Sequence, residues 1–185
     1  RELAKSVRGA FEGIEETVKQ QSQKDEPNVL RFTTYQSFAI NWLIPKLSRF
    51  NLLHPEIDVL LNVDDRQQDI RSEGYDLALR VGKETEVIRK EMFAPVYAPD
   101  LNGGKDICKE NACNFPLLEH QTKDAWGSWL ELNDEDAAKV KVAGRYSHSG
   151  LLIQAAAAGG GIALVPYAIA AEAIIEGKFK CVYGR

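Results

Sequence analysis

The sequence predicts an α/β protein of two subdomains with a cleft between them, preceded by one helix. From Val29 onward, short apolar runs alternate with helical stretches, which implies right-handed βαβ crossovers and parallel sheets. The alternation is laid out twice, and an extended segment that contains prolines separates the two parts. An amphipathic stretch closed by a polar segment and Pro27 comes before both.

Composition narrows the class of protein. The chain has 185 residues, of which 44% are hydrophobic and 27% charged, as in ordinary soluble globular proteins. Its formal net charge of -4 argues against this polypeptide binding a phosphate backbone by itself. No apolar run reaches the roughly 18 residues of a membrane span, and the first residues carry no signal-peptide pattern. We expect neither a membrane protein nor a preprotein.

Cysteines and histidines are few and scattered. The three cysteines have no Cys-x-x-Cys spacing, which favours a reduced, cytoplasmic protein with incidental thiols. The three histidines lie far apart and show no HExxH pattern. We therefore predict no metal site, no catalytic site and no cofactor. The residues concerned are Cys108, Cys113, Cys181, His54, His120 and His148.

The first element, over residues 1–24, is predicted to be a linker and dimerisation helix. Its apolar residues recur at alternating steps of four and three, which is a two-heptad seam. Such a seam predicts pairing with a second chain, and hence a homodimer or homotetramer. The alternative is a helix that packs on its own domain. The seam consists of Leu3, Val7, Ala10 and Ile14.

Residues 28–93 are predicted to form the first subdomain. Its longest helix has one apolar face, made by Leu43, Leu47 and Phe50 with Ile44 and Leu53 beside it. Pro45 falls in the first turns if this helix begins near residues 38–41, where a missing N–H costs little. The predicted elements are strands over 29–35, 57–63 and 75–82, and helices over 38–55 and 66–74.

Residues 94–185 are predicted to form the second subdomain, after the extended segment 87–100. Trp126 and Trp129 lie three apart on one helix and are expected in the core. Gly159–Gly161 follow a helix, so they are interpreted as a helix stop with positive φ and not as a phosphate loop. The predicted elements are strands over 115–120, 139–147, 161–166 and 179–184, and helices over 125–132, 149–158 and 167–177.

Polar residues follow the first strand at the carboxyl end of the predicted sheet, where open α/β sheets bind ligands. Thr34, Gln36 and Ser37 offer hydroxyl and amide groups there, ahead of a helix whose N-terminal N–H groups suit an anion. Residues 147–149, which are Ser147, His148 and Ser149, repeat the arrangement in the second subdomain. Two helix N-termini at one cleft favour a carboxylate or a phosphate.

Asp64 and Asp65 end the second predicted strand at the same edge and add negative charge. Because an acidic pair can receive an ammonium group, an amino acid, a peptide or a similar zwitterion is the natural ligand. Duller explanations remain open: Ser37 and Ser149 can be N-caps, worth roughly 1 kcal/mol each, and the acids can be solvated loop residues. Glycosidase chemistry is disfavoured, because adjacent residues at a strand end point to opposite faces.

Several stretches resemble the LysR-type transcriptional regulators, specifically their linker helix and effector-binding domain. The resemblance covers essentially the whole chain. Within the family, the sequence looks closest to the branch that includes regulators of glycine cleavage and of β-lactamase expression. It implies a type II periplasmic-binding-protein-like fold of two Rossmann-like subdomains. The stretches are the helical seam, "WLIPKLSRFNLLHPEIDVLL", "DIRSEGYDLALRVG" and "LLIQAAAAGGGIALVP".

The resemblance implies a cytoplasmic transcription factor that binds DNA through an N-terminal helix-turn-helix domain outside this chain. In the family the chain returns to the first subdomain with a further strand and helix, whereas this sequence stops at Arg185, and its loop around residues 82–86 is shorter than expected. The resemblance also implies which residues line the ligand pocket: Ser37, Asp64, Val81, Gly82, Tyr97, His148, Ser149 and Pro166. Together with Thr34, Gln36, Phe38 and Asp65 these are the predicted ligand-binding residues.

Two other classes of function fit the same sheet. A solute-binding protein of a transporter uses a two-lobed cleft, but it needs an export signal or lipobox, and the helical seam would have no role in it. An enzyme would need Asp64, His148 or a cysteine as its reactive group, and the sequence has neither a G-x-S-x-G elbow nor a third group placed to orient a base. The sequence therefore favours a non-enzymatic sensor of small molecules.

Overall fold

The computed structural model describes residues 28–66, 73–81, 90–122, 125–131 and 140–182. These residues divide into two compact units, each with its own sheet. The first holds 28–39 and 43–81, and the second holds 40–42 and 90–182. The chain passes from one unit to the other after Gly82, earlier than the predicted boundary between residues 93 and 94. No helix among the described residues is long and apolar enough to cross a membrane.

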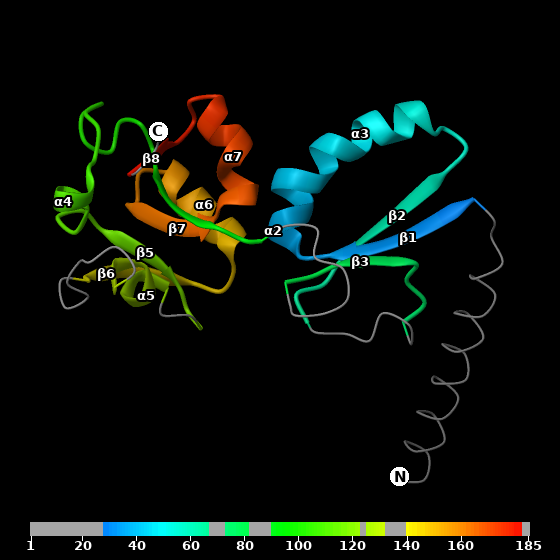
Figure 1. Cartoon of the computed structure of the whole chain (residues 1–185), viewed down its shortest axis with the longest axis horizontal. Helices are drawn as coiled ribbons and strands as arrows, with labels where there is room; N and C mark the ends of the chain where they lie inside the picture. Colours follow the sequence, from blue (N-terminus) through cyan, green and yellow to red (C-terminus); the bar gives the residue numbers. More distant parts are fainter. Residues whose placement is uncertain (1–27, 67–72, 82–89, 123–124, 132–139, 183–185) are drawn as a thin grey trace, which may run out of the picture. The chain divides into compact units, whose positions relative to one another are not determined.

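The sheet of the first unit is parallel throughout its described part, as predicted. It contains β1 (Val29–Thr34), β2 (Asp58–Val63) and β3 (Leu77–Leu79) in the order β2-β1-β3 (Figure 1). β1 is central and pairs with both neighbours in the same direction. β3 is shorter than the predicted strand because it pairs with only the last three residues of β1. The helix predicted over 66–74 falls largely outside the described residues.

The helix that follows β1 contains a wide turn. It runs through α2 (Gln36–Phe38), η1 (Ala39–Leu43) and α3 (Ile44–Leu53), and η1 is a π-helical turn in which the Ile44 N–H donates to the Ala39 carbonyl. The helix thus begins before the predicted residues 38–41, so Pro45 lies deeper than its first turns. A proline ring in an α-helix clashes with the carbonyl four residues earlier, here that of Asn41. The wider turn relieves that clash immediately before Pro45.

Only part of the predicted apolar face of this helix is covered. Leu43 is buried, and Leu47 and Phe50 are half-buried. Ile44 and Leu53 are 48% and 66% exposed, so the positions beside the face point to solvent within this chain. The helix therefore buries its first turns and leaves apolar side chains on its second half.

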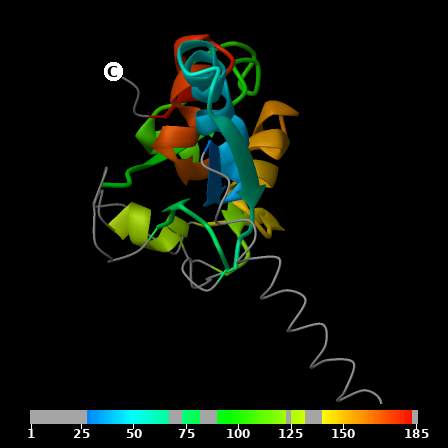
Figure 2. The same cartoon turned by 90° about the vertical axis from the view of Figure 1, so that its right-hand side faces the viewer.

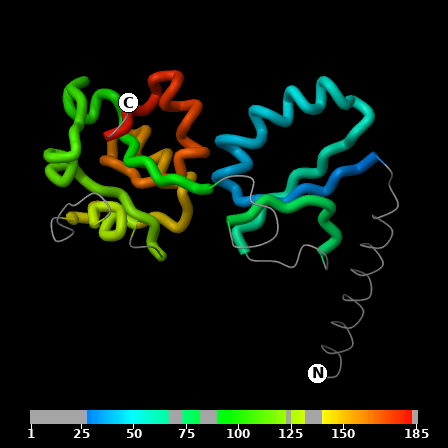
Figure 3. The backbone as a smooth tube through the Cα atoms, viewed as in Figure 1, coloured from blue at the N-terminus to red at the C-terminus, as the bar shows by residue number. Residues whose placement is uncertain are grey.

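The second unit is built on a mixed sheet, which corrects the prediction of a wholly parallel one. The segment predicted to be an extended crossing contains β4 (Phe93–Tyr97), which runs antiparallel to both of its neighbours. Figure 3 shows the end of the chain returning to lie beside β4. The strands are β4 (Phe93–Tyr97), β5 (Leu117–His120), β6 (Val142–Tyr146), β7 (Ile162–Pro166) and β8 (Lys180–Cys181), in the order β6-β5-β7-β4-β8.

Helices cover both faces of this sheet. α6 (Ser149–Ala157) and α7 (Tyr167–Ile175) lie on one side and α5 (Ala125–Glu131) on the other (Figures 1 and 2). The alternation along β7 agrees: Ile162 and Leu164 belong to the cluster that contains Trp126 of α5, so Ala163 between them faces α6 and α7. A short helix that was not predicted, α4 (Lys109–Ala112), adds Ala112 to the same cluster.

Trp126 anchors the face of the sheet that α5 covers. Its side chain is 1% exposed, and its indole N–H donates to the Leu118 carbonyl over 2.8 Å. Trp129 packs edge-on against it, with ring centroids 5.5 Å apart. The prediction that both tryptophans belong to the core is confirmed. Satisfying the indole N–H inside the core is what makes so large a polar side chain acceptable there.

A lysine holds the last short strand in place. Lys180 Nζ donates to the Gly104 carbonyl and to Asp106 Oδ1, both over 2.8 Å. The hydrogen bond that Lys180 donates to Asp106 raises the pKa of Lys180 above its usual value. The backbone N–H of Val182 adds a bond to the Pro95 carbonyl, so β8 is tied to β4 and to the loop that follows it.

The glycines after α6 end the helix, as predicted. Gly159 has φ +77°, and its N–H donates to the Ala156 carbonyl, which closes the last turn. Gly161 has φ +144°, and a Cβ atom there would lie 2.2 Å from the Pro116 carbonyl oxygen. The backbone of β7 thus enters the sheet through a gap that only glycine fits.

We expect Gly161→Ala to be among the most damaging single-methyl changes in the second unit. The new Cβ overlaps a backbone atom, so the strand entry must shift, and the free energy of unfolding should fall by about 3 kcal/mol or more. Gly159→Ala is the matched control, because its Cβ would meet no atom within 4 Å and should cost about 1–2 kcal/mol through backbone strain alone. Denaturant unfolding curves of both variants measure this difference. Equal losses would contradict the close approach at Pro116.

Candidate ligand-binding site

The end of β1 is fixed by two buried threonines. Thr33 and Thr34 are 1% and 0% exposed. The Thr34 hydroxyl donates to the Leu79 carbonyl of β3 over 3.0 Å, and the Thr34 carbonyl accepts the Asp64 N–H over 3.1 Å. Thr34 therefore links the three strands, and its predicted contact with a ligand stays a prediction.

The N-cap residue of the helix after β1 makes no side-chain hydrogen bond to the first turn. Tyr35 occupies the N-cap position and makes no side-chain capping bond, so Ser37 is not an N-cap. The backbone N–H of Gln36 instead donates to Asp65 Oδ1 over 3.2 Å. Ser37 lies in the first turn and is buried, with 9% of its surface exposed. Asp65 thus supplies the negative charge that a helix N-terminus favours.

Asp64 is paired within its own loop. Arg66 donates to both carboxylate oxygens of Asp64, with a shortest distance of 2.6 Å, and its backbone N–H adds a bond of 2.8 Å. The hydrogen bond to Asp64 raises the pKa of Arg66. Of the two predicted acids, one is neutralised by a neighbouring guanidinium and the other is bound to a backbone amide. Both carboxylates therefore already have hydrogen-bond partners within the first unit.

Arg80 is a functional candidate that sequence reasoning missed. Its guanidinium donates to the Thr33 hydroxyl over 2.8 Å and to the Leu79 carbonyl over 3.1 Å, and it lies 5.1 Å from the ring centroid of Tyr35. Within the part of the chain that the structure describes, these partners are all neutral. A partly buried cation therefore stands beside the start of the helix. Its place directly after a strand, in "LALR", is the signal that points to it.

In the second unit, His148 and not Ser149 is the N-cap of α6. His148 has extended backbone angles and makes no side-chain capping bond, while Ser149 is the first helical residue. The Nδ1 atom of His148 is buried and has no hydrogen-bond partner among the described residues. The interpretation of Ser149 as an N-cap is therefore wrong.

The other predicted residues divide between core, strand end and surface. Tyr97 is 1% exposed, and its hydroxyl accepts the Ile107 N–H over 2.9 Å, so it belongs to the core. Pro166 ends β7, where it pairs with Phe93, and is half-buried. Phe38 is half-buried and Val81 is 68% exposed. Gly82 and the seam residues Leu3, Val7, Ala10 and Ile14 lie outside the described residues.

The structure thus brings Gln36, Ser37, Asp64 and Asp65 together at one end of the first sheet, with Arg80 added. His148, Ser149 and Pro166 lie in the second unit. That residues of both units share one cleft stays a prediction. Across the described ranges no three His, Cys, Asp or Glu side chains gather as metal ligands.

Comparison with known proteins identifies the family. The pattern of the LysR substrate binding domain matches residues 23–183. The chain is 28% identical over 185 residues to the glycine cleavage system transcriptional activator of Escherichia coli K12, a match that covers 96% of this chain and 61% of that protein. It is 28% identical over 180 residues to the HTH-type transcriptional regulator BlaA of Proteus vulgaris, with 91% and 59% covered. The chain therefore spans about three fifths of the length of these relatives.

Solved structures agree on the fold. The AmpR effector binding domain of Citrobacter freundii superimposes with a TM-score of 0.68 at 22% identity, covering 85% of this chain and 82% of that one. CrgA of Neisseria meningitidis, a LysR-type transcriptional regulator, superimposes with a TM-score of 0.67 at 18% identity, covering 97% and 64%. The relatives are transcriptional regulators, so the transporter and enzyme alternatives find no support. The chain belongs to the LysR substrate-binding domain family.

Proposed function

We propose that the chain is the ligand-sensing part of a LysR-type transcriptional regulator that acts in the cytoplasm. DNA would be bound by a helix-turn-helix domain elsewhere in the same protein, and the chain itself would bind a small-molecule effector. Family membership over residues 23–183 supports the assignment. The acidic net charge of -4 fits a division of labour in which this part does not contact the phosphate backbone.

The effector is proposed to be a small anion or zwitterion held beside the start of α2. The observation that carries this is Arg80, whose described partners are two neutral oxygens and the Tyr35 ring. A guanidinium fixed in this way offers donors to a carboxylate without first breaking an ion pair. Gln36, which is exposed, and Ser37 in the same first turn would complete the polar surroundings. His148, with its unpartnered Nδ1, is the proposed contact from the second unit.

Arg80→Met tests this proposal. We expect free amino acids, cell-wall peptides and short carboxylates to include at least one ligand that raises the melting temperature of the unchanged chain. Its affinity for Arg80→Met should fall by about tenfold or more, because a charge-assisted bond is lost. Arg49→Met is the control, since Arg49 is an exposed arginine of α3. Calorimetric titration measures both variants. The proposal fails if only uncharged compounds bind, or if Arg80→Met binds as well as the control.

We further propose that the chain associates as a homodimer or homotetramer. The predicted seam over residues 1–24 would form one contact, and side-by-side packing of the α/β units another. Large apolar side chains on α3 and on the edge strand β2 are exposed, which is typical of surfaces that meet a partner. Leu52 is 83% exposed, and the others are Ile44, Leu53, Leu60 and Val63.

The double substitution Leu52→Glu/Leu53→Glu should convert the assembly to smaller species, because two charges would have to be buried in the contact. Ile175→Glu is the control: Ile175 is 81% exposed on α7, which belongs to the second unit. Light scattering at micromolar concentration measures the mass of each variant. A monomeric unchanged chain would refute the assembly, and an unaltered mass of the double variant would refute the use of α3.

A further inference from the structure

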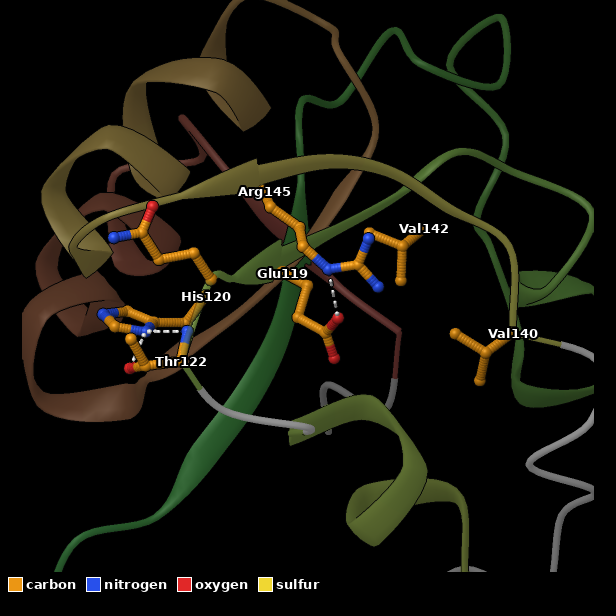
Figure 4. Close-up of a pocket in the computed structure, with 7 residues that line it drawn as sticks. Glu119, His120, Thr122, Val140, Val142 and Arg145 are labelled. Carbon is orange, nitrogen blue, oxygen red and sulfur yellow. Dashed lines mark hydrogen bonds and ion pairs between the residues drawn. The ribbon is translucent and has the colours of Figure 1, made fainter.

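The second unit contains a cavity whose lining does not include any predicted ligand-binding residue. It is open to solvent, has a volume of about 570 Å³ and lies along β5 and the edge strand β6 (Figure 4). All of its lining residues belong to the second unit. They are Glu119, His120, Gln121, Thr122, Val140, Val142 and Arg145.

Glu119 places a buried carboxylate against this cavity. Glu119 is 5% exposed, and its Oε1 atom is buried and has no hydrogen-bond partner among the described residues. A buried carboxylate oxygen that lacks a donor is costly, so a group that donates to it is favoured. The side chain comes from β5, whose backbone is held between β6 and β7. Glu119 therefore lines the cavity with a carboxylate whose Oε1 atom accepts no hydrogen bond from the described residues.

Arg145 faces Glu119 across the strand pair. The two residues are partners in the register of β5 and β6, and Arg145 Nε lies 3.4 Å from Glu119 Oε2. Figure 4 shows the guanidinium beside the carboxylate, with the ion pair marked. The Arg145 side chain is 60% exposed, so its outer nitrogens can reach a carboxylate that arrives from solvent.

The pairing of these two charges selects the kind of ligand. A lone amine would be drawn to Glu119 but repelled by Arg145, and a lone carboxylate would meet the reverse. A molecule with an ammonium group next to a carboxylate satisfies both at once, through the unpartnered oxygen and the guanidinium fork. A metal ion is disfavoured, because the described residues contain no group of three ligating side chains.

Apolar side chains complete the lining. Val140 and Val142, both half-buried, lie beyond Arg145 in Figure 4, while His120 and Thr122 lie on the other side of Glu119. Thr122 contacts His120 Nδ1 through its backbone N–H and its hydroxyl, at 3.3 and 3.0 Å, so that rim is already bonded internally. The valines offer a surface to an aliphatic group. We propose that this cavity is a second effector site, which binds a free α-amino acid with an aliphatic side chain.

L-valine is the probe, with isobutylamine and isovalerate as analogues that each keep one charge. Calorimetric titration of the full chain should show that L-valine binds and that each analogue binds at least about tenfold more weakly. Glu119→Gln and Arg145→Met should each weaken L-valine binding by about the same factor. Glu176→Gln is the control, since Glu176 is an exposed acid paired with Lys178. Circular dichroism and melting curves establish that each variant is folded.

Arg80→Met separates this site from the one proposed beside α2. If L-valine binding survives Arg80→Met and is lost in Glu119→Gln, the second site is supported whatever becomes of the first. If binding is lost in Arg80→Met and kept in Glu119→Gln, L-valine occupies the first site and the second is refuted. Absence of L-valine binding, or equal affinity for isovalerate, also refutes it.

Discussion

The parallel pairing of β1 with both of its neighbours is the constraint on which the first unit depends. Because the three strands run the same way, their carboxyl ends meet at one edge, and the residues after each strand become neighbours. The bond from the Asp64 N–H to the Thr34 carbonyl carries the ladder past the end of β2. Arg80 reaches Thr33 from the end of β3 for the same reason. Residues 29 to 47 positions apart thus surround the start of one helix.

Both units place guanidinium groups at strand ends, but with different partners. Arg66 neutralises Asp64 within one loop, and Arg145 meets Glu119 across two strands. Arg80 is bonded to neutral oxygens within the described structure. In the first arrangement the charges of Arg66 and Asp64 neutralise each other within one loop. In the other two, Arg80 keeps a positive charge without a described acidic partner, and Glu119 keeps an oxygen without a described donor. The Arg66–Asp64 pair therefore stabilises its loop, whereas Arg80 and the Glu119–Arg145 pair are suited to binding a ligand.

Much of the fold follows from alternation of apolar runs in the sequence. The strands and long helices of both units were predicted at nearly their observed places, because apolar runs of strand or helix length are separated by polar residues, glycines and prolines. The direction of β4 was missed, since "FAPVY" looks the same whether it crosses between sheets or joins one in reverse. The π-helical turn was missed because the helix was predicted to begin later, which put Pro45 in its first turns. The helix begins at Gln36, so Pro45 lies inside it and the wider turn accommodates the proline.

The candidate site was less predictable than the fold. Sequence located the strand-to-helix junctions at Gln36 and His148, since these follow from element order alone. The sequence does not show that the Thr34 hydroxyl donates to the Leu79 carbonyl of β3 or that Tyr97 is buried in the core. Both depend on contacts between distant segments. The Glu119–Arg145 pair was invisible for the same reason: only the register of β5 against β6 makes these two residues partners.

The ion pair between Lys180 of β8 and Asp106 weakens in alkali. A strand of two residues has few backbone bonds of its own, so Lys180 carries an unusual share of its attachment to Asp106 and Gly104. Since the pKa of this ammonium is raised in the folded chain, the contribution is fully present below the ordinary lysine value and disappears only as pH rises through the raised one. The lysine side of the Lys180–Asp106 pair therefore stays charged near neutral pH.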